Sequence, residues 1–268
     1  MSDIAIIQKA TLYEMADAII DTTERTESFK VSDMPTLIRE DVYDTGYNKG
    51  YAEGEADGKQ SQYDEFWDNF QNNGKRTSYL FAFYNYNDNI FYPKYDMICT
   101  GSAVAMFSSG KITNLKDRLQ ECGVTLDTSG ATAITEAFAY NSKLTNVPIV
   151  STISASSIAY LFSGDPVLVG IEKVILKSDG SQAINKTFTN CYALENLTIE
   201  GTIGQNGLDL QWSTKLSKAS ITSVINALST TTSGLSITLS KTAKEAAFTT
   251  NEWATLIATR TNWTINLV

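Results

Sequence analysis

The sequence contains no histidine among its 268 residues. Histidine is the commonest general base in enzymes and a frequent metal ligand, so its absence excludes Ser-His-Asp and Cys-His catalysis and histidine-ligated metals. Cysteine is scarce: Cys99, Cys122 and Cys191 are an odd number without CxxC spacing. We therefore expect buried thiols and no disulfide framework or zinc site. These absences argue against an enzyme, a metal site and a cofactor.

The chain also has no long apolar run and no even distribution of charge. No apolar stretch reaches the ~18 residues that suggest a membrane-spanning helix, and no signal-peptide pattern is present, so we expect a protein made in the cytoplasm without membrane insertion. Residues 1–73 carry 6 Lys/Arg against 16 Asp/Glu, and the remainder carries 15 against 14. An acidic segment and a near-neutral body repel nucleic acid, which we exclude as a partner.

Residues 1–41 contain two segments with apolar residues at helical spacing. The first covers residues 12–20, and the second follows Met34-Pro35, where a proline suits the first turn of a helix. A polar segment separates them. We expect a helical hairpin over 1–41 that acts as a docking module.

Glycine recurs every fourth residue in the next segment, 42–73. The residues concerned are Gly46, Gly50, Gly54 and Gly58, and Tyr47 and Tyr51 follow the same period. Each glycine weakens an isolated helix by about 1 kcal/mol, which favours a flexible linker. A strict four-residue period instead places the glycines on one helical stripe, where a second helix can approach closely. We favour this second interpretation, a long helical stem through which copies of the chain assemble.

Residues 74–101 are rich in aromatic residues and asparagine. The stretch from Tyr79 to Tyr95 predicts strands joined by a turn at Asn87-Asp88-Asn89. Exposed aromatic rings would form a carbohydrate-binding platform, whereas burial at the junction between stem and repeats is their more ordinary use. Asp64, Glu65 and Asp68, next to Trp67, resemble a glycosidase acid pair, but helical spacing places them on a solvated face.

Four stretches of residues 102–219 share a spacing that begins on phenylalanine. The phenylalanines are 31, 24 and 26 residues apart, and a helical turn and strand are expected in the insertion at 116–128. One such unit cannot bury its own apolar face, but stacked units form a continuous core. The expected core residues are Phe107, Phe138, Leu144, Phe162, Leu168, Phe188, Leu194 and Leu197.

Residues 220–268 depart from this spacing and are expected to form a capping repeat. Ser220 is expected to cap a helix, Thr249 and Glu252 to form a capping box, and LSITLS and WTINLV to be strands. The resulting fold class is α+β. It comprises an N-terminal helical hairpin and long helical stem, then a short leucine-rich-type β-solenoid with an α/β C-terminal cap.

Three segments resemble a known group of proteins. The segment LYEMADAII…TESFKVSDMPTLI resembles a module found at the start of many tail-associated proteins of phages and prophages from Gram-positive hosts. The stretch YNKGYAEGEADGKQSQYDEFWDNFQ with FYPKYDM, and the end LSKASITSVINALS…TTNEWATLIATRTNWTINLV, are similar to repeat-bearing phage and prophage structural proteins of Firmicutes. The array is similar to the BspA-type leucine-rich repeat, which also occurs in bacterial surface proteins.

The resemblance implies a non-enzymatic structural protein of the virion, a tail fibre or baseplate-type component that displays a host-binding surface. The implied partners are further copies of the chain, preferably in a trimer, other tail proteins, and a host cell-surface glycan or protein. The alternative is a bacterial surface adhesin or host-interaction protein of the leucine-rich repeat type. An adhesin needs export, whereas a virion reaches the cell surface after lysis.

Overall fold

The computed structural model describes residues 66–71, 76–84 and 91–268. The chain forms two compact units, Met1–Phe66 and Trp67–Val268, and almost all described residues belong to the second. The docking module expected over 1–41 lies outside the described residues. So do the residues expected to assemble the stem, namely Gly46, Gly50, Gly54, Gly58, Tyr47 and Tyr51.

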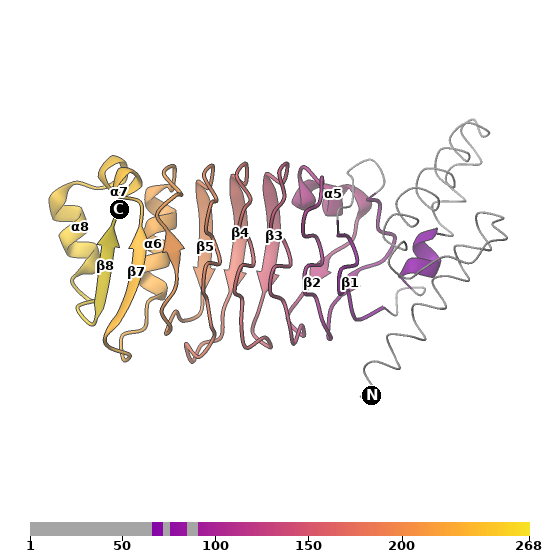
Figure 1. Cartoon of the computed structure of the whole chain (residues 1–268), viewed down its shortest axis with the longest axis horizontal. Helices are drawn as coiled ribbons and strands as arrows, with labels where there is room; N and C mark the ends of the chain where they lie inside the picture. Colours follow the sequence, from indigo (N-terminus) through magenta and orange to yellow (C-terminus); the bar gives the residue numbers. More distant parts are fainter. Residues whose placement is uncertain (1–65, 72–75, 85–90) are drawn as a thin grey trace, which may run out of the picture. The chain divides into compact units, whose positions relative to one another are not determined.

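The second unit consists of short strands and short helices, and all of its paired strands run parallel (Figure 1). The strands are β1 (Met97–Ile98), β2 (Leu126–Asp127), β3 (Asn146–Ser151), β4 (Gly170–Ile175), β5 (Asn196–Glu200), β6 (Asp209–Leu210), β7 (Leu235–Leu239) and β8 (Trp263–Leu267). The helices are α5 (Leu115–Cys122), α6 (Lys218–Ala227), α7 (Lys241–Ala247) and α8 (Thr250–Ile257).

The fold class expected from the sequence is wrong. The strands do not form one solenoid sheet but three separate parallel sheets, ordered β1-β2, β3-β4-β5 and β6-β7-β8. Helices α5 to α8 have only seven to ten residues, and of the expected stem the described part contains one short helical stretch, 66–70. The physical reason is that helices interrupt the strand positions at both ends of the central sheet.

Helix α5 belongs to the repeat unit of Phe107 and lies where a strand of that unit would pair with β3. Asn114 forms an isolated parallel β-bridge with Asn146. Its side chain, however, accepts a hydrogen bond from the N–H of Asp117, so a helix begins here instead of a strand. An N-cap of this kind satisfies a helical amide that a strand would leave for its neighbour. The central sheet therefore ends at β3 on this side.

Helix α6 ends the same sheet on the other side, next to β5 (Figure 1). The Ser220 hydroxyl accepts a hydrogen bond from the N–H of Leu197 at 2.9 Å and donates to the carbonyl of Glu195 at 2.7 Å. The Ser223 hydroxyl accepts from the N–H of Ile199 at 2.8 Å. The two serine hydroxyls thus accept hydrogen bonds from the β5 amides that would otherwise pair with a further strand.

Successive units are joined through a stack of phenylalanine rings. Phe83, Phe107, Phe138, Phe162 and Phe188 follow one another with ring centroids 4.9, 5.4, 5.2 and 5.6 Å apart and planes within 15° of parallel. All five are at most 2% exposed. We call this set the phenylalanine stack. Leu144, Leu168, Leu194 and Leu197 are buried beside it.

Left-handed backbone recurs on both sides of Phe107, Phe138, Phe162 and Phe188, two residues before each ring and two residues after it. The residues are Ala105 and Ser109, Glu136 and Tyr140, Tyr160 and Gly164, and Lys186 and Asn190, with φ between +50° and +79°. For a residue other than glycine this conformation costs on the order of 1 kcal/mol or more. Its recurrence identifies a required feature of the turn that carries each phenylalanine into the core.

Main-chain hydrogen bonds between units repay this cost. The amide of Phe138 donates to the carbonyl of Leu161 at 3.0 Å, and the amide of Phe162 donates to that of Thr187 at 2.9 Å. Amides between these positions bond three residues back within their own unit, as Leu161 does to Ile158. Every second amide is therefore available to the next unit, and these bonds satisfy donors that the turns would otherwise leave unpaired.

The structure adds two units that the phenylalanine spacing did not reveal. Phe83 lies 24 residues before Phe107 and stacks on it. Strands were expected between Tyr79 and Tyr95, but residues 80–84 form turns and residues 91–95 form no strand, while the expected turn at Asn87-Asp88-Asn89 lies outside the described residues. At the other end Leu210 takes the phenylalanine position 22 residues after Phe188 and is fully buried. The array therefore continues on both sides of the four expected units.

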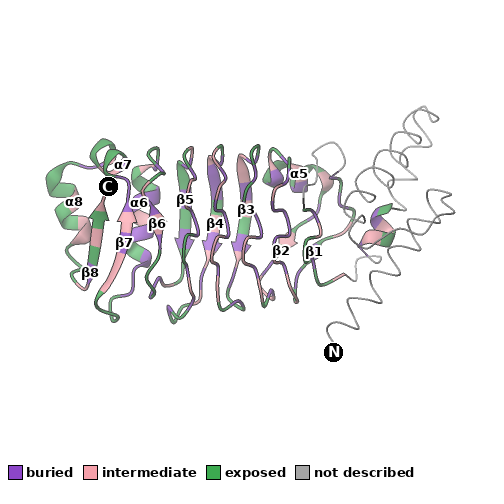
Figure 2. Ribbon diagram, viewed as in Figure 1, coloured by how far each residue is buried: buried purple, intermediate pink, exposed green. Residues whose placement is uncertain are grey.

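The C-terminal region contains the two expected strands, β7 and β8, and the capping box of α8. The Thr249 side chain accepts from the N–H of Glu252, whose carboxylate accepts from the N–H of Thr249. Ser220 does not cap α6 as expected; Ser217 is the N-cap, and Ser220 lies one turn inside the helix. Helix α7 was not expected. Helices α7 and α8 are largely exposed (Figure 2).

The phenylalanine stack should dominate stability. Replacing Phe162 with alanine removes a ring between two stacked neighbours, and we expect the free energy of unfolding to fall by about 3–5 kcal/mol. Chemical denaturation of the full chain measures this. Tyr192→Ala, which truncates an aromatic ring of a residue that is 47% exposed, is the matched control and should cost about 1 kcal/mol or less. Equal losses in the two variants would contradict a stabilising role for the stack.

Ser220 should act as an acceptor for the sheet edge and not as a helix cap. Ser220→Ala leaves the buried amide of Leu197 without its acceptor, which should cost about 1–3 kcal/mol. Thr222→Ala removes a hydroxyl from the same helix that makes no hydrogen bond in the structure, and it should be nearly neutral. Hydrogen exchange at the Leu197 amide should accelerate in the first variant alone. Unchanged exchange at Leu197 would refute the edge-capping role.

Candidate functional site

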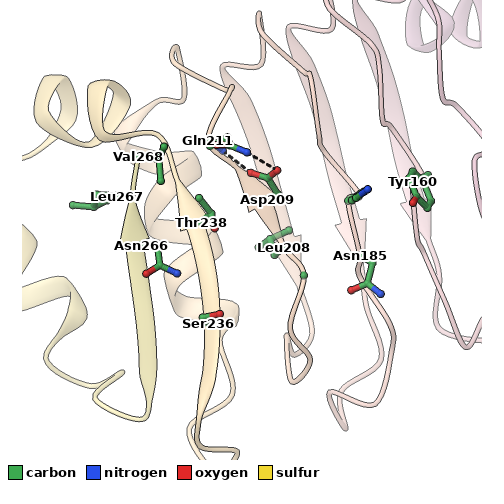
Figure 3. Close-up of a pocket in the computed structure, with 12 residues that line it drawn as sticks. Tyr160, Asn185, Leu208, Asp209, Gln211, Ser236, Thr238, Asn266, Leu267 and Val268 are labelled. Carbon is green, nitrogen blue, oxygen red and sulfur yellow. Dashed lines mark hydrogen bonds between the residues drawn. The ribbon is translucent and has the colours of Figure 1, made fainter.

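A hollow of about 860 Å³ lies where the last repeat turns meet β6, β7 and β8 (Figure 3). We call it the polar groove. Its lining is formed by Tyr160, Asn185, Lys186, Gly207, Leu208, Asp209, Gln211, Ser236, Thr238, Asn266, Leu267 and Val268. Most of these side chains carry hydrogen-bonding groups, and the labelled ones follow one another across successive passes of the chain.

Main-chain bonds between adjacent passes hold the lining in place. The amide of Tyr160 donates to the carbonyl of Asn185, and the amide of Lys186 to that of Gly207, both at 3.0 Å. The amide of Thr238 donates to the carbonyl of Leu208 at 3.1 Å. Beyond it, Thr238 of β7 pairs with Asn266 of β8. The groove thus lies on a rigid ladder and requires little ordering when a ligand binds.

Gly207 determines the position of Asn185 in this lining. Gly207 has φ of +106°, and a Cβ at this position would collide with the Oδ1 atom of Asn185. Glycine is therefore required for two reasons, its conformation and the close approach of a side chain. The rim continues into β7, since the Oδ1 atom of Asn206 accepts a hydrogen bond from the N–H of Ser236 at 2.7 Å.

The charges in the groove are balanced. Asp209 accepts hydrogen bonds from the main chain and the side-chain amide of Gln211, each at 3.0 Å. Lys186 places its Nζ 5.6 Å from the centroid of the Tyr160 ring, a cation–π contact. The lining side chains therefore present one carboxylate and one ammonium with hydroxyls and amides between them.

The groove lining contains a single carboxylate side chain, that of Asp209, so it does not present the carboxylate pair that glycosidases use. Among the described residues no three Cys, Asp or Glu side chains gather as a metal site. No helix in the described part is long and apolar enough to cross a membrane.

A second feature that sequence reasoning missed is a column of buried polar residues beside the phenylalanine stack. Asn141, Asp165, Cys191 and Ser213 each follow the stacked position of their unit by three residues and are at most 1% exposed. The Cys191 thiol donates to the carbonyl of Phe162 at 3.0 Å. The signal in the sequence is a polar or small residue at one fixed offset, visible only once the units are aligned.

Asp165 is the unusual member of this column. Its Oδ1 atom accepts a hydrogen bond from the main-chain N–H of Asn141 at 2.6 Å, whereas its Oδ2 atom is buried without a hydrogen-bond partner. Burial raises the pKa of the Asp165 carboxyl well above its ordinary value, and the bonds from Asn141 oppose that shift only in part. Burial likewise raises the pKa of the neighbouring Cys191 thiol, and the Asp165 carboxylate adds to this effect.

The structure gives the positions of the three cysteines, of Asp68 and of the expected repeat-core residues. Cys99 and Cys191 are buried as expected, while Cys122 is only partly buried. Asp68, which was expected on a solvated face, is partly exposed and accepts hydrogen bonds from the Tyr95 hydroxyl at 2.5 Å and from Lys94 Nζ at 2.9 Å. The expected repeat-core residues lie in the interior and not in the groove.

No family model, curated protein or solved structure matches this chain.

Asp165 should make stability depend on pH. Its folded pKa lies above its unfolded value of about 3.9, so its contribution is fully present below that value and is lost as pH rises through the folded pKa. At pH values between the unfolded and the folded pKa of Asp165, the free energy of unfolding should fall by about 1.4 kcal/mol per pH unit. Asp165→Asn should abolish this slope, whatever constant offset the amide introduces. Denaturation at several pH values tests this; parallel pH profiles of the two proteins would contradict it.

Proposed function

We propose that the chain is a non-enzymatic structural and display protein of a phage or prophage tail, a tail fibre or baseplate-type component that presents a host-binding surface. The resemblance of its N-terminal, central and terminal segments to tail-associated proteins supports the origin. The stacked units support the display role, because they arrange exposed side chains in rows on a ladder of main-chain hydrogen bonds.

The observation that carries the proposal is the combination of a rigid polar groove with the lack of a catalytic set in its lining. Sites that hold a ligand without transforming it need positioned donors and acceptors but no base or nucleophile. The groove has amides, hydroxyls, Asp209 and Lys186 in fixed places. Rigid positioning on main-chain ladders suits repeated binding events on a virion surface.

Assembly into homo-oligomers, preferably trimers, is part of the same proposal and is based on the sequence. It is proposed from the four-residue period of Gly46, Gly50, Gly54 and Gly58 within residues 42–73, with Tyr47 and Tyr51 in the same period, because glycine leaves room for a second copy of the chain to approach closely. The 1–41 segment would dock to other tail proteins. Several copies of the groove on one particle would raise binding strength through avidity.

The location can be tested by analysing particles after prophage induction. We expect the chain to copurify with tails in density-gradient fractions that contain virions, and mass spectrometry of these fractions to detect it in multiple copies. Uninduced cells are the control and should not carry it on their surface. Its presence on uninduced cells and its absence from particles would contradict the tail assignment and favour the adhesin.

A further inference from the structure

We propose that the polar groove binds an uncharged, hydroxyl-rich chain of linked sugars. This inference deepens the proposed function by naming the ligand class of the display surface. It is argued from the lining of the groove, and it concerns a place different from the aromatic segment 79–95 that the sequence suggested as a carbohydrate platform.

The length and course of the groove favour an extended ligand. Its floor crosses five adjacent passes of the chain, marked by Tyr160, Asn185, Asp209, Thr238 and Asn266 (Figure 3). Adjacent hydrogen-bonded passes lie about 4.8 Å apart, so four such steps extend over about 19 Å. A single small metabolite would fill only part of this length, whereas a linear chain of several sugar rings can contact every pass.

The chemistry of the lining favours sugar hydroxyls. Each hydroxyl both donates and accepts a hydrogen bond, so it is best matched by groups that offer both. The amides of Asn185, Gln211 and Asn266 provide donors and acceptors in fixed planes, and Ser236 and Thr238 add hydroxyls. The Gln211 amide is already oriented by its bond to Asp209, which leaves its carbonyl oxygen as an acceptor for a ligand.

The aromatic ring at one end of the groove suits the apolar face of a sugar. Tyr160 is partly exposed, and its left-handed φ of +59° fixes the start of its side chain on the turn. An aromatic ring combines an apolar surface with a polar tip, which is the pairing that a ring bearing hydroxyls requires. Lys186 lies over this same ring and can donate to an oxygen of the ligand.

Other classes of ligand fit less well. A nucleic acid or another polyanion needs a groove with clear excess positive charge, but Lys186 and Asp209 balance each other here. A peptide bound in β-form needs an open strand edge or apolar pockets. The main chain of β7 on the floor is engaged on both sides instead, by the bond from Thr238 N to Leu208 O and by the pairing of Thr238 with Asn266, so within this sheet only the outer edge of β8 is open to a peptide.

The test uses the full chain and isothermal titration calorimetry against neutral hexose and N-acetylhexosamine oligosaccharides. Poly(glycerol phosphate) and an extended peptide serve as probes of the competing classes. We expect at least one neutral oligosaccharide to bind, with an affinity that changes little from low to high salt because no ion pair is formed. Binding of poly(glycerol phosphate) or peptide alone, or of no probe, would overturn the proposal.

Alanine substitutions inside and outside the groove test whether an oligosaccharide binds there. Asn266→Ala and Gln211→Ala each remove an amide from the lining and should weaken oligosaccharide binding about tenfold, which corresponds to one lost hydrogen bond of about 1.4 kcal/mol. Asn226→Ala removes an exposed amide from α6, outside the groove, and should leave binding unchanged. Thermal unfolding of each variant shows that the fold is retained. Equal affinity in Asn266→Ala and Asn226→Ala would overturn the site.

The glycan site and the tail assignment fail in different ways. A chain found in virions that binds no oligosaccharide would remove the glycan site and leave the tail role standing. A chain that binds oligosaccharides through the groove but is absent from virions would retain the site and remove the tail role.

Discussion

The hydrogen bonding between consecutive repeat turns is the constraint on which the other features depend. Each turn must direct every second amide towards its neighbour, and it does so by adopting left-handed backbone two residues before and two residues after the buried ring. Tyr140 and Lys186 adopt this conformation without being glycine, at a local cost. That cost is offset because the same geometry brings Phe138, Phe162 and Phe188 into parallel contact and satisfies the buried main chain.

The ends of the stack determine where a ligand can bind. Beside the central sheet, α5 and α6 occupy the strand edges, and Ser220 and Ser223 bind the amides that a further strand would use. Towards the C-terminus, no helix of the described part ends the series of repeat turns that carry the stacked rings. Their main-chain hydrogen bonds continue through β6 into β7 and β8. A continuous polar ladder therefore forms where a turn of the array meets a regular sheet, and the groove lies on that ladder.

The interior contains buried polar side chains that the phenylalanine stack does not need and whose burial costs stability. Asn141, Asp165, Cys191 and Ser213 occupy one column, and Asp165 leaves an oxygen without a partner. A buried polar group of this kind destabilises the fold unless it is neutral or paired. It can also fix the register between neighbouring units, because Asn141 N binds Asp165 Oδ1 across the unit boundary. The protein thus combines an apolar stack, whose ring contacts are not directional, with a polar column whose hydrogen bond joins two specific residues of neighbouring units.

The sequence by itself determined which side chains of the array face inward, the capping box at Thr249 and the strands β7 and β8, because periodicity and local capping depend on neighbours in the chain. Tertiary structure alone decided that Phe83 and Leu210 extend the stack, that Ser220 binds the edge of β5 and that separate sheets replace a single one. None of the groove was predicted, since Tyr160 and Asn266 are more than a hundred residues apart. Apolar spacing reports which residues require burial, whereas the partner of each backbone amide is chosen by contacts between units that lie 22 to 31 residues apart.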